Sequence, residues 1–294
     1  MVVWRERRES DGVAVVNPEQ SWQKLVDMSL VSAAKVVESI ERSHILTDYR
    51  LHPGILWRIP NFRVGLGIGL HKGWAIEGAI GSEFKVEASY LSPNVNMASL
   101  LQEATHEFGT HIIMSGEFAN DLSKRMRAEC RLIDVVRFRG QLPNQCTKLF
   151  TLDLNTGFLP VETEITVQTL LKIPEHNRPT QRQLGRLRFQ LKKDRELQKT
   201  KKWGSEFVPR DLLDRGDLHA MRKPYCQTFR NDFEHAYMNY QAGEWRTAHH
   251  FFVKLQRQHP ELAHDGPTTV LLRHMEASRK KAPASWKGVR AVNY

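Results

Sequence analysis

Two groups of residues are similar in type to known chemical sites, so their spacing must be examined. His106, Glu107 and His111 resemble the ligand set of a zinc-protease helix, and glycines alternate between residues 65 and 69. The histidines, however, are five residues apart instead of four, and Gly109 ends the helix between them. The glycines lie inside an apolar strand, whereas a dinucleotide site needs them in a turn that opens a helix. We therefore predict neither a zinc site nor a dinucleotide site.

Three cysteines and the lack of a long apolar run indicate the compartment. Cys130, Cys146 and Cys226 are widely spaced and fit neither a disulfide framework nor a zinc motif. The sequence has no run of about 18 apolar residues, and its basic N-terminus has no apolar segment behind it. We expect a reduced, cytoplasmic protein, with a membrane tether, if one exists, outside this chain. No Gly-x-x-x-x-Gly-Lys loop occurs, which argues against a P-loop enzyme.

A central stretch of the chain must position any site. Residues 62–70 place large apolar residues at every second position with glycines between them, which predicts a strand with one bare face. A bare face leaves room for a helix or a ligand. We expect residues 71–73 to turn and residues 74–80 to return as the second strand of a hairpin. A further strand, 85–91, should end where Ser92 and Pro93 begin a helix.

That helix is amphipathic. Four residues form one apolar stripe: Met97, Leu101, Ala104 and Phe108. Asn96 lies at the edge of the stripe, and position 100 lies beside it one turn later. The hydrophobic content of 40% in 294 residues is enough for a core of one or two domains. The remaining elements that we predict are a helix at 21–43, a surface loop at 48–60, a buried strand at 110–115 and a surface helix at 116–126.

The order of these elements resembles a known family. A strand, the Gly-Leu-His-Lys-Gly turn, a second strand, Gly-Ala-Ile-Gly, a short strand and Asn-Val-Asn-Met-Ala-Ser are together similar to the second half of a class III nucleotide cyclase catalytic domain of the protist and algal type. The resemblance covers roughly residues 1 to 153, and the segments 130–138 and 148–154 look like the family's final pair of strands. It implies an α+β, ferredoxin-like (βαββαβ) domain that packs head to tail with a second cyclase domain. ATP or GTP would be cyclised in the cleft between the two domains.

The resemblance also assigns roles to particular residues. Asn96 matches the asparagine that orients the ribose or the transition state. Arg139 matches a basic residue that contacts the triphosphate, and a guanidinium suits a phosphate. Glu87 or Ser89 would face the purine. The alternatives are that Asn96 is only a local hydrogen-bonding residue near a helix start and that Arg139 is a solvated hairpin charge.

Two departures from the family pattern limit what we expect of this chain. The family has an arginine that stabilises charge on the reacting phosphate where this chain has Leu100. Losing one such donor typically costs on the order of 100- to 1000-fold in rate. The family also implies Mg or Mn, but its two metal-binding aspartates would precede Met1. We therefore expect a fragment, a truncated gene product or a degenerate paralogue without metal ligands, and the choice between adenine and guanine stays open.

The second half of the chain changes character. Between residues 178 and 202 there are ten Lys or Arg against Asp194 and Glu196, within a chain whose formal net charge is +10. This run is either a solvated linker helix or a surface for acidic lipid or nucleic acid. It has almost no aromatic residues to stack on bases, so we expect no specific nucleic-acid partner.

The last 70 residues are predicted to be helical. Small and aromatic residues around Gly243 resemble one tetratricopeptide hairpin: Ala236, Tyr240, Trp245, Ala248 and Phe252. One such unit cannot bury its own face, so it should dock on the cyclase-like domain or on a partner. The segment 286–288, Trp-Lys-Gly, is similar to the tails of protist cyclases.

Together these features predict three regions: a cyclase-like domain at 1–154, a basic linker at 155–224 and a helical region at 225–294. The function implied is cyclic-nucleotide synthesis from a purine triphosphate in intracellular signalling, which the chain should not perform alone. The alternative is a pseudo-cyclase or adaptor that binds a partner cyclase domain or an acidic surface without catalysis.

Overall fold

The computed structural model describes residues 18–43, 46, 49, 52–59, 64–82, 85–142, 144–159, 186, 189–190, 192–194, 197 and 207–292, except for the side chains of 18–21, 80 and 86–88. Most of the basic run at 178–202 lies outside the described residues. The described part is a mixed α+β structure.

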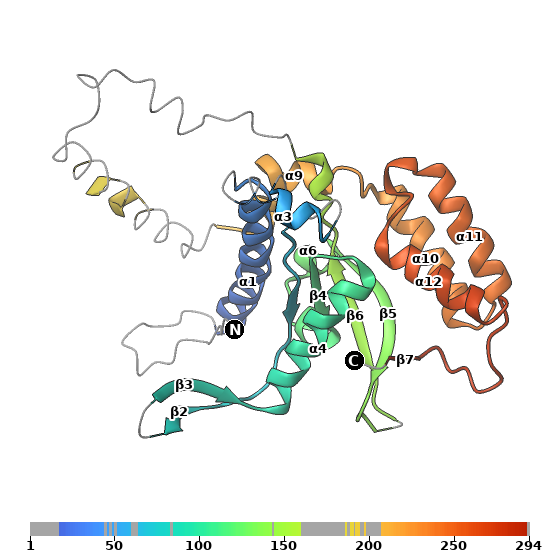
Figure 1. Ribbon diagram of the computed structural model, residues 1–294, viewed down its shortest axis with the longest axis horizontal. Coiled ribbons are helices and arrows are strands. Elements are labelled where there is room, and N and C mark those ends of the chain that lie inside the picture. Colours follow the sequence, from blue (N-terminus) through green and yellow to red (C-terminus); the bar gives the residue numbers. More distant parts are fainter. Residues whose placement is uncertain are drawn as a thin grey trace, which may run out of the picture.

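Residues 18–152 alternate helices with short strands (Figure 1). The elements in this range are α1 (Pro18–Glu41), α3 (Pro53–Leu56), β1 (Ile68–Leu70), β2 (Ile76–Ser82), β3 (Lys85–Leu91), α4 (Pro93–Phe108), β4 (Ile112–Ser115), α5 (Gly116–Asn120), α6 (Lys124–Arg127), β5 (Cys130–Phe138) and β6 (Thr147–Leu152). The later elements are a 3-10 turn (Pro209–Asp214), α9 (Gly216–Arg222), α10 (Gln227–Gln241), α11 (Trp245–Gln258), α12 (Gly266–Ala277) and β7 (Arg290–Val292).

The main sheet has the strand order β1-β4-β6-β5-β7 and is covered on both faces. Strand β4 shows how the two faces form, because its side chains alternate with the period of two that a strand imposes. Ile112 and Met114 pack in one core cluster with Leu30 and other residues of α1. Ile113 packs in another with Leu101 and other residues of α4. The two helices therefore lie on opposite faces of the sheet.

The hairpin of the central stretch differs from the prediction. Strand β2 pairs with β3, from Ile76 opposite Leu91 to Ser82 opposite Lys85, and not with β1. Strand β1 belongs to the main sheet, where it runs parallel to β4. Of the predicted strand 62–70 the structure describes residues 64–70, and among these the regular strand covers Ile68–Leu70. The five residues 71–75 carry the chain out of the sheet, and the β2–β3 hairpin projects away from the body of the molecule (Figure 1).

Helix α4 is formed as the sequence predicts. The Ser92 side chain accepts a hydrogen bond from the backbone N–H of Asn94, and Pro93 occupies the first helical turn. Gly109 ends the helix in the left-handed conformation, at φ +58°, which glycine adopts without strain. Leu101, Ala104 and Phe108 of the predicted stripe are fully buried.

Two other predicted segments need correction. The expected surface helix at 116–126 is two short helices, α5 and α6, and it is not a surface element because Phe118, Ala119 and Met126 are buried. The carboxylate of Asp27 accepts hydrogen bonds from the backbone and hydroxyl of Ser123 between these helices, which interrupts the helical run. The expected loop at 48–60 contains a short helical turn, α3.

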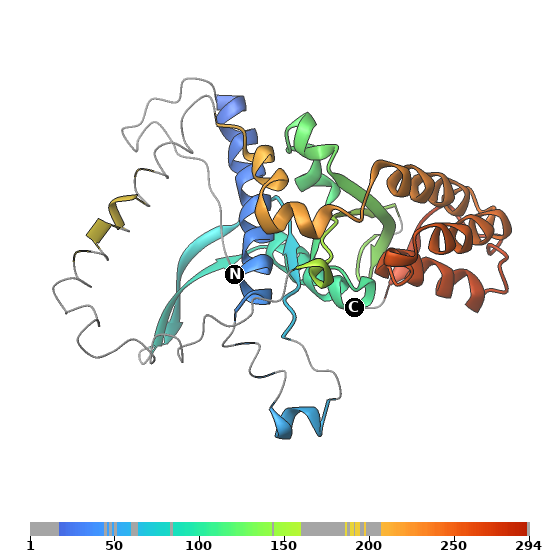
Figure 2. The ribbon, with the colours of Figure 1, turned by 90° about the horizontal axis from the view of Figure 1, so that it is seen from above.

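The C-terminal helices form their own core and also complete the sheet. Aromatic residues of α10 and α11 fill this core, with the Tyr240 and Trp245 rings stacked 5.6 Å apart and Trp286 set edge-on to both. Strand β7 then returns to pair with β5, Val136 opposite Arg290. The helices gather beyond β5, on the side of the sheet edge away from α1 (Figures 1 and 2). No helix among the described residues has the length and apolar character needed to cross a bilayer.

Candidate functional site

A polar joint fixes the root of the β2–β3 hairpin against the first turn of α4. The His71 ring lies between two partners, with Nδ1 2.7 Å from Ser115 Oγ and Nε2 3.2 Å from Asn94 Oδ1. The Asn94 amide donates to the Trp74 carbonyl at 2.8 Å, and the Ser92 hydroxyl donates to the same carbonyl at 2.6 Å. The joint thus ties β1, β4, the hairpin and α4 together.

The protonation state of His71 follows from its surroundings. Burial lowers the pKa of this histidine, against the opposing effects of the Asn94 hydrogen bond and the Glu117 charge. Asn94 uses its N–H₂ group on Trp74, so its oxygen faces the ring and Nε2 of His71 donates to it. In the neutral ring Nδ1 then accepts from the Ser115 hydroxyl. His71 accordingly links these segments through hydrogen bonds at both ring nitrogens.

The bare face of the glycine strand is covered by α4. A methyl group added at Gly69 would lie 2.2 Å from the Ala98 carbonyl oxygen, and one at Gly67 would lie 2.0 Å from Thr105 Oγ1. Contacts this short are not possible for real side chains. The glycine face of this strand is therefore packed against helix α4 and leaves no room for a ligand at Gly67 and Gly69.

A cavity of about 200 Å³ lies between α1, the 71–75 link and α4. Lys72 and Asp121 form an ion pair at its edge, and the Trp22 indole N–H donates to the same carboxylate at 2.7 Å. The cavity is smaller than the 300–1,000 Å³ that is usual for ligand pockets. None of the residues predicted for the site lines it, so it is not the predicted cleft.

The predicted residues occupy α4, the hairpin and the β5–β6 turn. Asn96 is exposed in the first turns of α4, and Arg139 is exposed in the turn after β5. Ser89 is half-buried in β3, opposite Gly78. Glu87 lies in the same strand, opposite Ile80, but its side chain is outside the described part.

Helix α4 and the end of strand β5 contribute to one core cluster. Leu100 is half-buried and packs against the cluster that contains Phe138, the residue directly before Arg139. The first turns of α4 and the β5–β6 turn both lie toward the lower end in Figure 1. Leu100 and the residue before Arg139 therefore share this core cluster, and Asn96 lies one turn before Leu100 on α4. Ser89 is joined to α4 through Ser92, where β3 runs into the helix.

The residues that the structure describes do not fit a divalent metal. They contain no group of three or more His, Cys, Asp and Glu side chains that could hold one. His106 is exposed and contacts Gln102, and His111 lies beyond the end of α4, where burial lowers its pKa. The described residues therefore offer no ligand set for the Mg or Mn that the resemblance implies.

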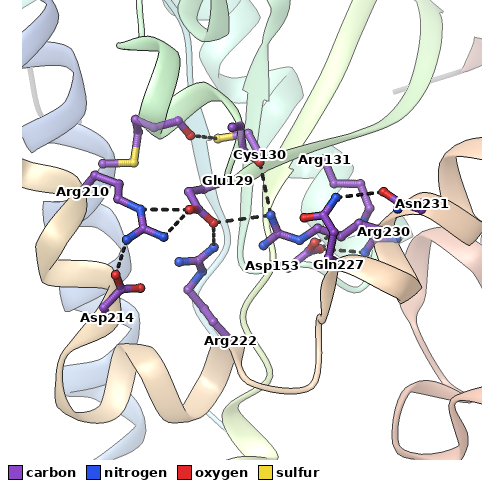
Figure 3. A network of polar contacts seen from close by, with 12 residues as sticks. Glu129, Cys130, Arg131, Asp153, Arg210, Asp214, Arg222, Gln227, Arg230 and Asn231 are labelled. Carbon is purple, nitrogen blue, oxygen red and sulfur yellow. Dashed lines mark hydrogen bonds and ion pairs between the residues drawn. The ribbon is translucent and has the colours of Figure 1, made fainter.

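A second polar cluster joins the sheet to the C-terminal region (Figure 3). Glu129, just before β5, receives three guanidinium groups, from Arg210, Arg222 and Arg230. Burial raises the pKa of Glu129, but hydrogen bonds and charge from Arg222 and Arg210 outweigh this and lower it to about 2. The carboxylate is thus ionised throughout the neutral range. Burial raises the pKa of the neighbouring Cys130 thiol to about 12, so this cysteine is not a nucleophile.

Two buried arginines complete this junction. Arg131 of β5 pairs with Asp153 and with Asp265, both at 2.7 Å, and its guanidinium lies 4.2 Å from the Phe233 ring centre. Arg290 of β7 pairs with Asp134 of β5 at 2.7 Å and with Glu107 of α4 at 2.6 Å. The sequence analysis did not predict the Glu129 cluster, the buried ion pairs of Arg131 and Arg290 or the His71 joint. The only local signal was a histidine within the Gly-Leu-His-Lys-Gly turn.

Comparisons with known proteins give one sequence match and several weak structural ones. No protein-family profile matches the chain. An adenylate cyclase of Anabaena cylindrica is 29% identical over 80 residues, which are 27% of this chain and 16% of that protein. Two structures described as a bacterial light-regulated adenylyl cyclase are 18% identical, with TM-scores of 0.33 and 0.32. The matches cover 45% and 51% of this chain and 34% and 37% of theirs.

The sequence match supports a cyclase-like domain in this chain. The chain spans only about a sixth of the curated relative's length, because the match covers 16% of that protein.

Proposed function

We propose that this chain supplies one half of a nucleotide cyclase cleft and that a second cyclase domain supplies the other half. The observation that supports the proposal is that Leu100, one turn after Asn96, packs against the core cluster of Phe138, the residue before Arg139, in a chain similar to an adenylate cyclase. By resemblance, Asn96 orients the ribose and the Arg139 guanidinium holds the triphosphate, since a planar guanidinium suits phosphate oxygens. Ser89, and Glu87 in the same strand, are assigned to the purine, which is adenine or guanine.

The partner would dock on the hairpin. Three large apolar side chains at its root are mostly exposed: Trp74 at 64%, Ile76 at 62% and Leu91 at 64%. Such a group of exposed apolar residues is typical of an interaction site. The His71 joint holds the hairpin root against α4, so a domain bound here would lie beside the exposed Asn96. This arrangement supports the head-to-tail partner that the resemblance implies.

Leu100 limits the activity of this half-site. A leucine offers neither charge nor a hydrogen bond to the reacting phosphate, where loss of one donor costs on the order of 100- to 1000-fold. The described residues also do not fit a divalent metal. We therefore propose that turnover, where it occurs, depends on groups outside the described residues, and that the chain works in the cytoplasm, where free Cys130, Cys146 and Cys226 stay reduced.

The alternative is a pseudo-cyclase that binds a partner domain without catalysis, and Leu100 favours it. To separate the two, we would measure conversion of ATP and of GTP with manganese, first by the chain alone and then mixed with a metal-competent cyclase domain. Product above that of the partner domain, lost in Asn96→Ala and Arg139→Ala, would support a shared cleft. Association without added product would establish the pseudo-cyclase, and product from the chain alone would contradict the proposal.

Leu100→Arg should restore the missing donor. In the mixture we expect activity to rise by at least about tenfold, a conservative figure beside the usual cost of losing such a donor. Ser99→Arg is the matched control, because Ser99 is the exposed neighbour on the same helix. Circular dichroism would verify that both variants fold. Equal activity of the two arginine variants would mean that position 100 does not face the reacting phosphate.

A further inference from the structure

A second cavity lies between strands β5 and β6 and helix α10. Its volume is about 380 Å³, which is within the usual range for small-molecule pockets. Phe150, Phe233 and Met238 give it an apolar lining. None of the residues assigned to the proposed cleft lines this cavity, so a site here goes beyond the proposed function.

Arg127 is the first sign that the cavity takes an anion. Its guanidinium carbon lies over the Phe150 ring, 3.7 Å from the ring centre, and the side chain is half-buried. It forms no ion pair with any residue in the described part of the chain. Burial lowers the pKa of Arg127, against a smaller opposing effect of Cys130. A half-buried cation without a counter-charge is costly unless an anion binds to it.

Arg230, on α10 across the cavity, is the second sign. Its side chain is 14% exposed, and its Nε is buried without a hydrogen-bond partner in the described structure. Its Nη1 reaches Glu129 only at 3.4 Å, because that carboxylate also receives Arg210 and Arg222 (Figure 3). Asp214 also pairs with Arg210, so two carboxylates meet three guanidinium groups and one positive charge is in surplus at this end of β5.

The rim adds further donors. Lys148 of β6 is exposed and has no ion pair with a described residue. The side chains of Gln227 and Asn231 lie beside Arg230, joined to each other by a 2.8 Å hydrogen bond (Figure 3). Glu234 contributes one carboxylate to the lining, and Arg131 is already paired with two aspartates. The cations Arg127, Lys148 and Arg230 therefore outnumber the acids that are free to meet them.

We propose that this cavity binds a phosphoryl group, with Arg127, Arg230 and Lys148 around the phosphate and the apolar lining against the remainder of the ligand. The guanidinium of Arg127 is held in place by the Phe150 ring, so little side-chain freedom is lost when an anion binds. The phosphoryl group belongs either to a soluble phosphorylated compound or to a lipid headgroup. The partly enclosed shape between strands and helix suits one such group and not an extended polyanion.

The test is calorimetric titration of the full chain with inorganic phosphate and with pyrophosphate at low salt. We expect binding that weakens as salt rises. Arg127→Gln should lower the affinity by about tenfold, the size expected for one charge-assisted hydrogen bond. Lys148→Gln should lower it less, because that side chain is exposed. Arg125→Gln is the matched control, since Arg125 is an exposed arginine on the same helix and lies outside the cavity lining.

Two further arms separate the outcomes. Arg139→Ala removes the phosphate contact of the proposed cleft, so binding that survives in this variant but falls in Arg127→Gln assigns the phosphate to the new cavity. Binding lost in Arg139→Ala and unchanged in Arg127→Gln and Lys148→Gln would overturn the inference and leave the proposed cleft standing. Absence of binding both to soluble phosphates and to vesicles carrying a phosphoinositide would also overturn it. Vesicle binding alone, sensitive to Arg127→Gln, would identify the lipid source.

Discussion

Apolar side chains are usually buried and charged ones exposed. The β2–β3 hairpin and the junction between the sheet and the C-terminal helices depart from this rule in opposite ways. The hairpin leaves Ile76 and Leu91 more than 60% exposed, while the junction buries the Arg131 side chain to 5% exposure. Arg131 lies between Asp153 and Asp265, so its charge is matched. Nothing in the described structure covers the hairpin residues in the same way.

The difference shows which part of the molecule holds it together and which part is available to a partner. Two carboxylates around a buried guanidinium require a specific geometry, because any misalignment leaves a charge unpaired. Exposed apolar residues require no geometry until another surface covers them. We therefore expect changes at the junction to alter stability and changes at the hairpin to alter binding.

The largest effect is expected for Arg131→Ala. It leaves Asp153 and Asp265 buried without their partner, and removing one member of such a network costs about 3–5 kcal/mol. Urea unfolding followed by circular dichroism would measure the loss. The exposed Arg125→Ala should change stability by less than about 0.5 kcal/mol. Equal results for the two variants would show that the junction does not hold the C-terminal helices on the sheet.

Two glycines test the contrast between sheet and hairpin directly. Gly69→Ala places a methyl group 2.2 Å from the Ala98 carbonyl, and we expect a loss of about 1–3 kcal/mol as α4 shifts away from β1. A methyl at Gly78, in the hairpin, would meet nothing within 4 Å. Gly78→Ala should therefore leave the unfolding midpoint almost unchanged. A loss at Gly78 as large as that at Gly69 would mean that the hairpin is packed in solution.

The Glu129 cluster predicts a pH dependence. The pKa of this carboxyl is lowered from 4.5 to about 2 in the folded chain, so its ionised form stabilises the fold. This stability is present above pH 4.5 and is lost as pH falls from 4.5 toward 2, with unfolding linked to uptake of up to about one proton. The free energies of unfolding of the wild type and of Glu129→Gln, measured across this pH window, should converge at the acid end. A constant difference between them would contradict the assignment of this pKa to Glu129.

The smallest effect on stability is expected at the hairpin. Ile76→Ser removes an exposed apolar side chain, so the free energy of unfolding should change by less than about 0.5 kcal/mol. Affinity for a partner cyclase domain should nevertheless fall by about tenfold if Ile76 is an anchor of the interface. Sedimentation of the mixture measures this, with Ala79→Ser as the control. An unchanged affinity would remove the hairpin from the proposed interface.

Local sequence signals were sufficient for several elements. The Ser92-Pro93 start, the apolar stripe and Gly109 defined α4 from Pro93 to Phe108, because caps and a 3.6-residue period act within the helix itself. The resemblance placed a strand at 130–138, and the bounds of β5 are Cys130–Phe138. The sequence was also enough to single out Asn96, Leu100 and Arg139 as candidate site positions, although their roles remain proposals.

Pairing between distant segments was decided only by the tertiary structure. The sequence determined that residues around 68 and 76 are strands, but a period of two is the same whichever strand lies alongside, so the pairing of β1 with β4 could not be derived. The buried arginines are a stronger case, since Arg131 and Asp265 are 134 residues apart and Arg290 and Asp134 are 156 apart. In the sequence these are ordinary charges. Only folding removes them from water together, and that shared burial gives each of them its partner.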